Sequence, residues 1–375
     1  MGRSDRAPAP VAQKFAYSAA PTMKDIAAAA GVSQSTVSRV LSGTPFLVPI
    51  ASTTKDRVLA VARDRGFRPN PLAQALRGAR TMLLGVIVGD ITDPFYAGVI
   101  EAISVAARAN AYNVVLGHAH GRPNEAIELR AVLETRHCDA IILLGDMSGQ
   151  PGMVAELGEA RVPTVSLGRG VRHDDGMPSV DVDNQHGIFA AMDYLVTLGH
   201  ERIAHIGGPP IGDFPARRVA YLDFMSRHGL RVRRRYNPRT TNDACGGSST
   251  MQALLALPVP PTAVIAATDL VAIGAMHAAH LAGVQVPNDI SVIGFDDLPI
   301  AAYTVPALTT VHMPIVEMAA IAVREAIVQV RGVSTDFEAK AFVPEPNLVI
   351  RDSCSSPPAT AGEESAVLDQ SPRQQ

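Results

Sequence analysis

The sequence predicts two structural classes in one chain. An all-α helix-turn-helix head precedes an α/β core of two lobes, each built on a doubly wound parallel sheet. Residues 22–41, TMKDIAAAAGVSQSTVSRVL, read as two short helices joined by a tight turn. From residue 82 onward, short apolar strand-like runs alternate with helix-length segments, which is typical of βαβ units. Charge also divides the chain, since residues 22–80 carry a net +6 and residues 81–375 a net −11.

The first helix of the head has both of its expected end signals. Thr22 is a good N-cap, and Asp25 lies three residues later, where a capping-box partner belongs. Gly31 ends the helix because glycine tolerates the left-handed conformation. Ile26 and its alanine neighbours give the helix one apolar side.

The second helix is the candidate DNA-reading element. Ser33 caps it, and Val37, Val40 and Leu41 are spaced to face inward. The remaining side chains are polar and short apart from one arginine, which suits a helix that enters a major groove. The candidate DNA contacts on this helix are Gln34, Ser35, Thr36, Ser38 and Arg39. Helix pairs around a glycine turn also occur in domains that touch no DNA, and the basic charge of the head favours the DNA-binding interpretation.

Two further segments complete the head. Residues 52–65 read as a third helix, whereas the stretch from Pro45 to Pro49 cannot be regular helix. Within residues 69–80, Asn70 caps a short helix with Pro71 at its first position. That helix is too short to be stable alone.

The core contains two sets of predicted strands, separated near residues 182–184. The strands read as continuous apolar runs because helices cover both faces of a parallel sheet. The first set is MLLGVIV, NVVLG, AIILL and PTVSL, and the second is RIAHI, TAVIAA and SVIGF. We therefore expect two lobes within residues 81–352.

Composition places the chain among globular proteins of a reducing compartment. It has 375 residues, of which 47% are hydrophobic and 18% charged, so it is long enough to bury large cores. The three cysteines are widely spaced, which favours reduced thiols in the cytoplasm. No apolar run is long enough to cross a membrane, and residues 1–21 and 353–375 read as a disordered extension and a disordered tail.

No motif for catalysis, a cofactor or a metal is present. The chain has neither G-x-S-x-G nor H-E-x-x-H. His118 and His120 lie two residues apart without a matching third ligand. The expectation is a non-enzyme without a cofactor or a metal.

Several motifs together resemble the LacI/GalR family of bacterial transcriptional regulators. They are MKDIAAAAGVSQSTVSRVLSG, RGFRPNPLAQALR, GVIVGDITDPFYAGVIEAI, LGHERIAHIGGP and PTAVIAATDLVAIGAMHAAHLAGVQVPNDISVIGFDD. The resemblance covers roughly residues 22–352. It implies a periplasmic-binding-protein-like core whose chain crosses between the lobes near Asp183, His312 and Ala341. Lobe one would then hold residues 81–183 and 312–340, and lobe two residues 184–311 and 341–352.

The resemblance also gives the head its boundaries and its hinge. Residues 22–68 match the DNA-binding domain, although the loop between Pro45 and Ile50 is about three residues longer than the family pattern. Residues 69–80 match the hinge that folds on operator DNA, with Leu76 as the residue that wedges into the minor groove. The alternative is an ordinary linker whose Leu76 docks on a neighbouring surface.

Candidate effector contacts follow the predicted strands, because ligands of doubly wound sheets bind at strand carboxyl ends. Asp93 serves as a helix cap, a ligand contact or both. By resemblance, the other candidates are Phe95, Tyr96, Arg217, Thr268 and Asp296. Core packing for Phe95, a solvated Arg217 and a loop-capping Asp296 are the structural alternatives. Asn242 stands where an aromatic platform is frequent in the family, and Thr268 where an amide is frequent.

The function that this combination predicts is a ligand-responsive transcriptional repressor. It would bind a palindromic double-stranded operator as a homodimer and respond to a sugar or sugar derivative in the cleft between its lobes. The alternatives are a solute-binding protein of the same fold and an enzyme on a doubly wound sheet. The basic head disfavours the first alternative, and the missing catalytic motifs disfavour the second.

Overall fold

The computed structural model describes most of the chain in two separate units, Met1–Thr81 and Met82–Gln375. The described residues are 21–42, 49–67, 80–119, 122–135, 138–145, 162–168, 177–332 and 341–358. Four predicted features therefore lie wholly or partly outside the described part: residues 1–20 of the extension, most of the Pro45–Ile50 loop, residues 69–79 of the hinge with Leu76, and residues 359–375 of the tail. No helix in the described part of the chain is long and apolar enough to cross a membrane.

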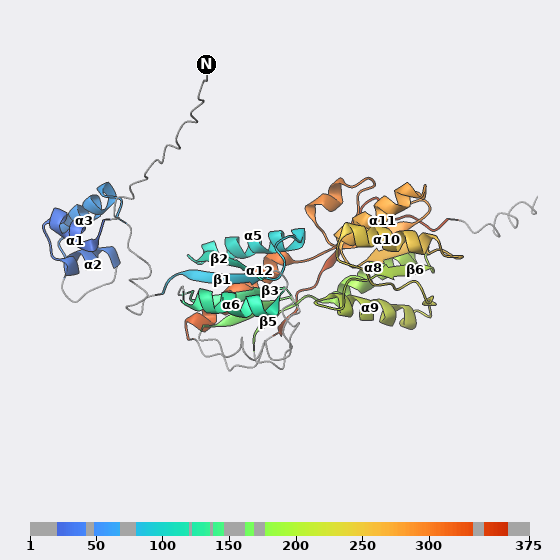
Figure 1. Cartoon of the computed structure of the whole chain (residues 1–375), viewed down its shortest axis with the longest axis horizontal. Coiled ribbons are helices and arrows are strands. Elements are labelled where there is room, and N and C mark those ends of the chain that lie inside the picture. Colours follow the sequence, from blue (N-terminus) through green and yellow to red (C-terminus); the bar gives the residue numbers. More distant parts are fainter. Residues whose placement is uncertain are drawn as a thin grey trace, which may run out of the picture. The chain divides into compact units, whose positions relative to one another are not determined.

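The first unit is the predicted helix-turn-helix head (Figure 1). It consists of α1 (Met23–Ala30), α2 (Gln34–Ser42) and α3 (Ser52–Asp64). Thr22 and Asp25 form a complete capping box, and Gly31 ends α1 in the left-handed conformation with φ of 62°. The three helices bury a small apolar core that includes Ile26, Val37 and Val58.

The first lobe of the second unit is built on a fully parallel six-stranded sheet in the order β10-β5-β4-β3-β1-β2. Its strands are β1 (Leu83–Val88), β2 (Asn113–His118), β3 (Ala140–Leu144), β4 (Thr164–Leu167), β5 (Ser179–Val180) and β10 (Ala341–Phe342). Alternate residues of β1 explain the two covered faces. Val86 packs with α5 (Pro94–Ala109) and α12 (Ile315–Val330), whereas Ile87 packs with α6 (Pro123–Thr135).

The second lobe has a five-stranded sheet in the order β11-β9-β8-β7-β6. Its strands are β6 (Ile203–Ile206), β7 (Ala263–Ala266), β8 (Ser291–Asp296), β9 (Thr309–His312) and β11 (Asn347–Val349), and only β11 pairs antiparallel to its neighbour. One face packs against α8 (Asn184–Thr197) and α9 (Phe214–Arg227). The other face packs against α10 (Ala244–Leu255) and α11 (Asp269–Leu281), and a 3₁₀ helix, η2 (Pro299–Tyr303), follows β8.

The chain crosses between the lobes three times, and the third crossing corrects our expectation. The first crossing follows β5 and the second follows β9, close to the expected Asp183 and His312. Ala341 and Phe342 pair with Ser179 and Val180 in the first lobe's sheet. The third crossing therefore lies within residues 343–346 rather than at 341.

The end of the described chain also departs from expectation, because the segment from Ser353 to residue 358 packs against the second lobe. Ser353 is fully buried, and its hydroxyl donates to the Val292 carbonyl while accepting from the Thr309 amide at 2.8 Å. The Ser355 carbonyl accepts from the buried His200 ring, 2.8 Å away. A serine-rich composition was misleading here, since these hydroxyls and backbone groups satisfy polar atoms of the lobe.

Candidate functional site

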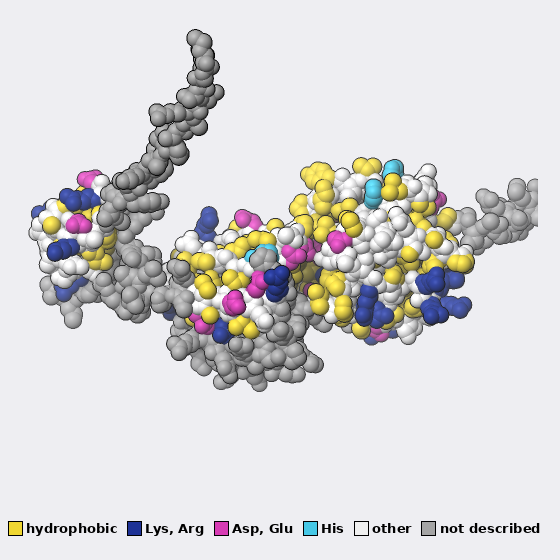
Figure 2. Space-filling view, in the orientation of Figure 1, with side chains coloured by type: hydrophobic (Ala, Val, Ile, Leu, Met, Phe, Trp, Pro, Cys, Tyr) yellow, Lys and Arg dark blue, Asp and Glu magenta, His cyan; other side chains and the backbone are white. Residues whose placement is uncertain are grey.

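The exposed face of α2 carries the residues predicted to meet DNA. Gln34, Ser35 and Arg39 are exposed, while Thr36 and Ser38 are half-buried. Ser33 caps the helix as expected, since its hydroxyl accepts from the Thr36 amide at 3.2 Å. Figure 2 shows Lys and Arg side chains on the described surface of this unit. The Thr36 hydroxyl also bonds to Ser33 at 2.8 Å, so its first role is to hold the turn that presents the helix.

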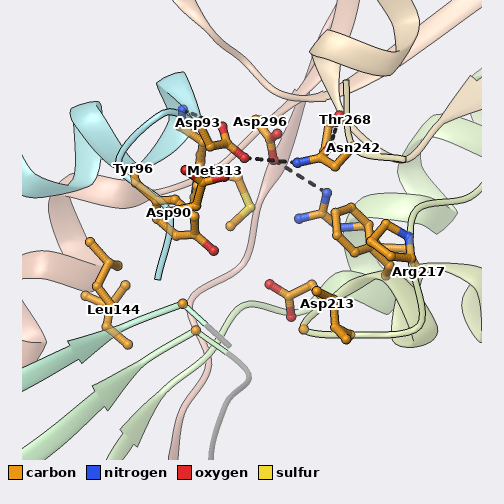
Figure 3. Close-up of a pocket in the computed structure, with 18 of the residues that line it drawn as sticks. Asp90, Asp93, Tyr96, Leu144, Asp213, Arg217, Asn242, Thr268, Asp296 and Met313 are labelled. Atoms are coloured by element: carbon orange, nitrogen blue, oxygen red, sulfur yellow. Dashed lines mark hydrogen bonds and ion pairs between the residues drawn. The ribbon is translucent and has the colours of Figure 1, made fainter. Parts of the chain in front are cut away.

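A cavity of about 210 Å³ opens between the two lobes of the second unit, at the carboxyl ends of both sheets. This is the position at which doubly wound sheets bind ligands. The structure brings all six predicted effector contacts together around it: Asp93, Phe95, Tyr96, Arg217, Thr268 and Asp296. Figure 3 labels five of them, and these come from elements of both lobes: Asp93, Tyr96, Arg217, Thr268 and Asp296.

Asp93 caps a helix, as one of the sequence-based alternatives expected, and its second carboxylate oxygen bonds to the opposite lobe. One carboxylate oxygen caps α5 by accepting from the Phe95 amide at 2.9 Å. The other oxygen accepts from the Asn242 amide of the opposite lobe, also at 2.9 Å. Burial raises the pKa of Asp93, and the nearby Asp90 adds to the rise.

The contact of Asp93 belongs to a short chain of hydrogen bonds that spans the cleft. The Thr268 hydroxyl donates to Asn242 Oδ1 at 2.7 Å, and Asn242 Nδ2 donates onward to Asp93. Thr268 also caps α11, which fixes the direction of its side chain. Asn242, which departs from the family pattern, therefore forms a bridge between the lobes (Figure 3).

Arg217 is buried on the inner side of α9, with only 4% of its surface exposed. A solvated Arg217 is therefore wrong. Its Nε donates to Asn184 Oδ1 at 2.9 Å, and one terminal nitrogen donates to the Ala267 carbonyl. The guanidinium group lies 3.6 Å from the centroid of the Phe295 ring. These contacts give the arginine a structural role inside the second lobe as well as a place at the cleft.

Asp296 ends β8 in an unusual backbone conformation. It has φ of 112° and the next residue, Asp297, has φ of 53°, values that cost free energy in residues with a side chain. The turn directs Asp296 toward Arg217, 3.5 Å away, and Asp297 toward Arg351, 2.6 Å away. Burial raises the pKa of Asp296 well above its usual value, although Arg217 opposes the shift.

Several cavity residues escaped the sequence reasoning. Asp90 follows β1, Asp213 precedes α9 in the connection after β6, and Phe214 is the first residue of α9, so the rule of strand carboxyl ends would have found them. Phe214 supplies an aromatic surface to a cavity in which Asn242 stands where the family frequently has an aromatic platform. Gly145 is required at the floor, because a Cβ there would lie 2.6 Å from the Tyr96 hydroxyl.

The site has the chemistry of a binding pocket. It offers carboxylates, one arginine, an amide and a hydroxyl among aromatic and aliphatic walls, a combination typical of small-molecule sites. Within the described ranges, no group of three His, Cys, Asp or Glu side chains is placed to hold a metal ion.

Comparison with known proteins agrees with this architecture. The family model for bacterial regulatory proteins of the lacI family matches residues 22–70, and the model for a periplasmic binding protein-like domain matches residues 192–354. The HTH-type transcriptional repressor CytR of Escherichia coli (strain K12) is 33% identical over 317 residues, which span 84% of this chain and 91% of CytR.

Solved structures show the same fold. The lac repressor dimer bound to operator and the anti-inducer ONPF aligns with a TM-score of 0.81 at 24% identity, covering 89% of this chain and 99% of that one. The complex of the transcriptional regulator CelR with cellobiose aligns with a TM-score of 0.65 at 29% identity and the same coverage. The chain belongs to the LacI family of DNA-binding transcriptional regulators.

Proposed function

We propose that the protein is a repressor that binds a palindromic operator as a homodimer and is controlled by a small-molecule effector in the cleft between its lobes. The observation that carries the proposal is the cavity at the carboxyl ends of both sheets. Its polar side chains come from both lobes, so a ligand bound there contacts both at once.

Two relatives support the proposed dimer, operator and sugar effector. The lac repressor was solved as a dimer on operator DNA, and CelR was solved with the disaccharide cellobiose. A sugar or sugar derivative suits this cavity because hydroxyl groups pair with carboxylates and an arginine, while aromatic rings pack against apolar sugar faces.

On the DNA side, α2 supplies the proposed reading surface. Arg39 is the base-reading candidate, and Gln34, Ser35, Thr36 and Ser38 are the accompanying contacts. One head per half-site would match the two-fold symmetry of a dimer with that of a palindrome. Leu76, which lies outside the described residues, stays a prediction as the minor-groove wedge.

Control of DNA binding would follow from unequal affinity of the effector for two arrangements of the lobes. A ligand shifts such an equilibrium only by its difference in affinity for the two states. The coupling is reciprocal, so operator DNA changes effector affinity by the same factor as effector changes operator affinity.

The test begins with fluorescence anisotropy of the full-length protein on genomic fragments, which selects the operator. A thermal-shift screen of metabolites then selects the effector, and calorimetry measures its affinity with and without saturating operator. We expect a sequence-selective complex and an effector affinity that changes by several-fold when operator is bound. Equal affinity for operator and random DNA, or an effector affinity indifferent to operator, would contradict the proposal.

A further inference from the structure

The second lobe carries an arginine-rich segment between α9 and α10. Residues 231–239 read RVRRRYNPR, which places five arginines and no acidic residue within nine positions. Residues 81–375 carry a net charge of −11, so the segment contrasts with the rest of the core. Figure 2 shows Lys and Arg side chains gathered on the surface of this lobe. None of the five arginines forms an ion pair with a described residue, so their charges are free to meet a ligand.

The backbone of this segment is fixed to the edge of the second lobe's sheet. The Tyr236 carbonyl accepts from the His205 amide at 2.7 Å, and the Pro238 carbonyl accepts from the Gly207 amide at 2.9 Å, so the chain runs beside β6. The Tyr236 side chain is buried, and its hydroxyl donates to the Val259 carbonyl at 2.8 Å. The arginines therefore extend from a backbone that is already ordered, which lowers the entropy cost of binding.

A groove of about 490 Å³ lies between this segment and α10. The segment contributes Arg234, Arg235 and Asn237 to its lining, and α10 contributes Ser249 and Thr250. No acidic side chain is among the described residues that line it. The groove shares no lining residue with the cavity between the lobes, so it is a separate candidate site.

The polar groups of the groove are rich in hydrogen-bond donors. The guanidinium groups of Arg234 and Arg235 donate and cannot accept. The Thr250 hydroxyl makes no hydrogen bond within the described part of the chain. Asn237 Oδ1 lies 3.2 Å from His205 Nδ1, whereas Asn237 Nδ2 is buried and has no partner among the described residues. Unmatched donors beside two positive charges favour a ligand that brings several acceptor oxygens and negative charge.

The rest of the groove is apolar. Pro238 lines it from the segment, and Ala253, Leu254 and Leu257 line it from the end of α10 and the turn that follows. An arginine cluster that only keeps a surface solvated needs no recess of this kind beside it. A nucleic-acid backbone would contact the charges and leave the apolar side empty. The combination fits a small molecule with a phosphate group at one end and an apolar face at the other.

We propose that this groove is a second small-molecule site, separate from the cleft between the lobes, and that it binds organic phosphates. Arg234 and Arg235 hold the phosphate group through bidentate hydrogen bonds, and the Thr250 hydroxyl donates a further one. Leu254 and Leu257 pack against the body of the ligand.

The other three arginines of the segment act at longer range. Arg231, Arg233 and Arg239 do not line the groove, and they add to the positive potential that draws an anion toward it. The proposal concerns binding at the groove alone, and it stands or falls independently of operator binding and of effector binding in the cleft.

The experiment measures dissociation constants of the full-length protein by calorimetry, in a phosphate-free buffer at about 0.15 M salt. The probes are inorganic phosphate, glucose 6-phosphate and adenosine 5′-monophosphate, with glucose and adenosine as their phosphate-free partners. We expect at least one of the two organic phosphates to bind at least about tenfold more tightly than inorganic phosphate, because its body adds contacts with the apolar side of the groove.

Charge variants assign that binding to the groove. Arg234→Gln combined with Arg235→Gln should weaken the organic phosphate by at least about tenfold, since charge-assisted hydrogen bonds are lost. Arg231→Gln combined with Arg239→Gln is the matched control, because both are exposed arginines of the same segment that do not line the groove. The control should weaken binding by less than about threefold, since these charges act only through solvent.

A second pair of variants tests the recess without changing the charge. Ala253→Phe places a ring in the groove and should also weaken the organic phosphate by at least about tenfold. Gln252→Phe is its control, because Gln252 is the preceding exposed residue of α10 and does not line the groove. The control should bind the organic phosphate as the unsubstituted protein does.

The remaining outcomes each count against the proposal. If neither organic phosphate binds, or if either binds equally well to the Arg234 and Arg235 double variant, the groove is not a phosphate site. Binding that survives Ala253→Phe would place the phosphate outside the recess and overturn the proposal as well. Fluorescence anisotropy on random-sequence DNA tests the alternative occupant: if the double variant loses affinity for DNA while no organic phosphate binds, the arginines serve a nucleic-acid backbone instead.

Discussion

Replacement of Arg217 by methionine should destabilise the second lobe far more than a typical arginine substitution on a helix. Methionine keeps much of the packing against Phe295 but removes the donors to Asn184 and to the Ala267 carbonyl. It also leaves Asp296, with a side chain only 6% exposed, without its counter-charge. Loss of one partner from a buried pair costs about 3–5 kcal/mol, and we expect about 3 kcal/mol because Asp296 partly escapes by taking up a proton.

The stability lost on replacing Arg217 by methionine should increase with pH. A carboxyl whose pKa is raised by folding binds more protons in the folded chain than in the unfolded chain between its two pKa values, so its contribution to stability falls as pH rises through that interval. Burial raises the pKa of Asp296, and Arg217 is the largest influence that lowers it. Without Arg217 the interval extends to higher pH. The cost of the substitution should therefore be smallest near about pH 5 and larger near about pH 8.

Thermal unfolding of the full chain, followed by circular dichroism, measures this loss. A change of about 3 kcal/mol corresponds to a fall in Tm of about 6–12 °C in a unit of this size. Arg227→Met is the matched control, because Arg227 lies on the same helix in an exposed pair with Asp223 and is worth about 0.5 kcal/mol. A Tm that falls no further in Arg217→Met than in the control, or a loss independent of pH, would refute the structural role of Arg217.

Three further predictions follow from other parts of the molecule. Arg39→Ala should lose about 1–3 kcal/mol of discrimination between operator and random DNA while the fold and effector binding persist; unchanged footprints at equal salt would show that Arg39 does not read bases. Asn242→Ala should remove a bond to a carboxylate worth about 1.5–3 kcal/mol and let the lobes separate, so small-angle scattering should show a larger radius of gyration, and an unchanged radius contradicts a bridging role. Burial raises the pKa of Asp269 to about 7, so the free energy of unfolding should fall between about pH 4 and pH 7, and Asp269→Asn should flatten that slope by up to about 1.4 kcal/mol per pH unit in urea titrations; an equal slope would show that Asp269 is not its source.

Local signals explain which parts of the fold could be predicted. The capping box of Thr22 and the left-handed Gly31 depend on residues within one turn of each other, so the sequence displays them directly. Strands β1–β4 and β6–β8 were equally visible, because strands covered on both faces are continuous apolar runs, whereas β5, β9, β10 and β11 were not predicted. Helical spacing also indicates that Arg217 is buried, because it lies on the same face of α9 as the buried Ala220, Tyr221 and Phe224.

Contacts between distant residues were beyond the same reasoning. Asp93 and Asn242 lie 149 residues apart, and their hydrogen bond depends on how two complete lobes dock. No spacing or propensity in either segment encodes that docking. The ordered segment that begins at Ser353 was missed for a related reason, since the Ser353 hydroxyl bonds to strand residues that lie 44 and 61 residues earlier in the chain.

The hydrogen-bonded bridge between Asn242 and Asp93 bears on how an effector would act. Most polar groups of the site are held within one lobe, as Arg217 is by Asn184, whereas the bond from Asn242 to Asp93 links the two lobes. A ligand that leaves this bond intact adds contacts to both lobes and would therefore favour the bridged arrangement. A ligand that donates a hydrogen bond to Asp93 displaces Asn242 from it. Such a ligand stabilises the bridged arrangement less, because its own bond must first offset the lost bond between Asn242 and Asp93. The effector that stabilises the bridged arrangement most should thus be one that bonds to other residues of the cleft and leaves Asp93 with Asn242.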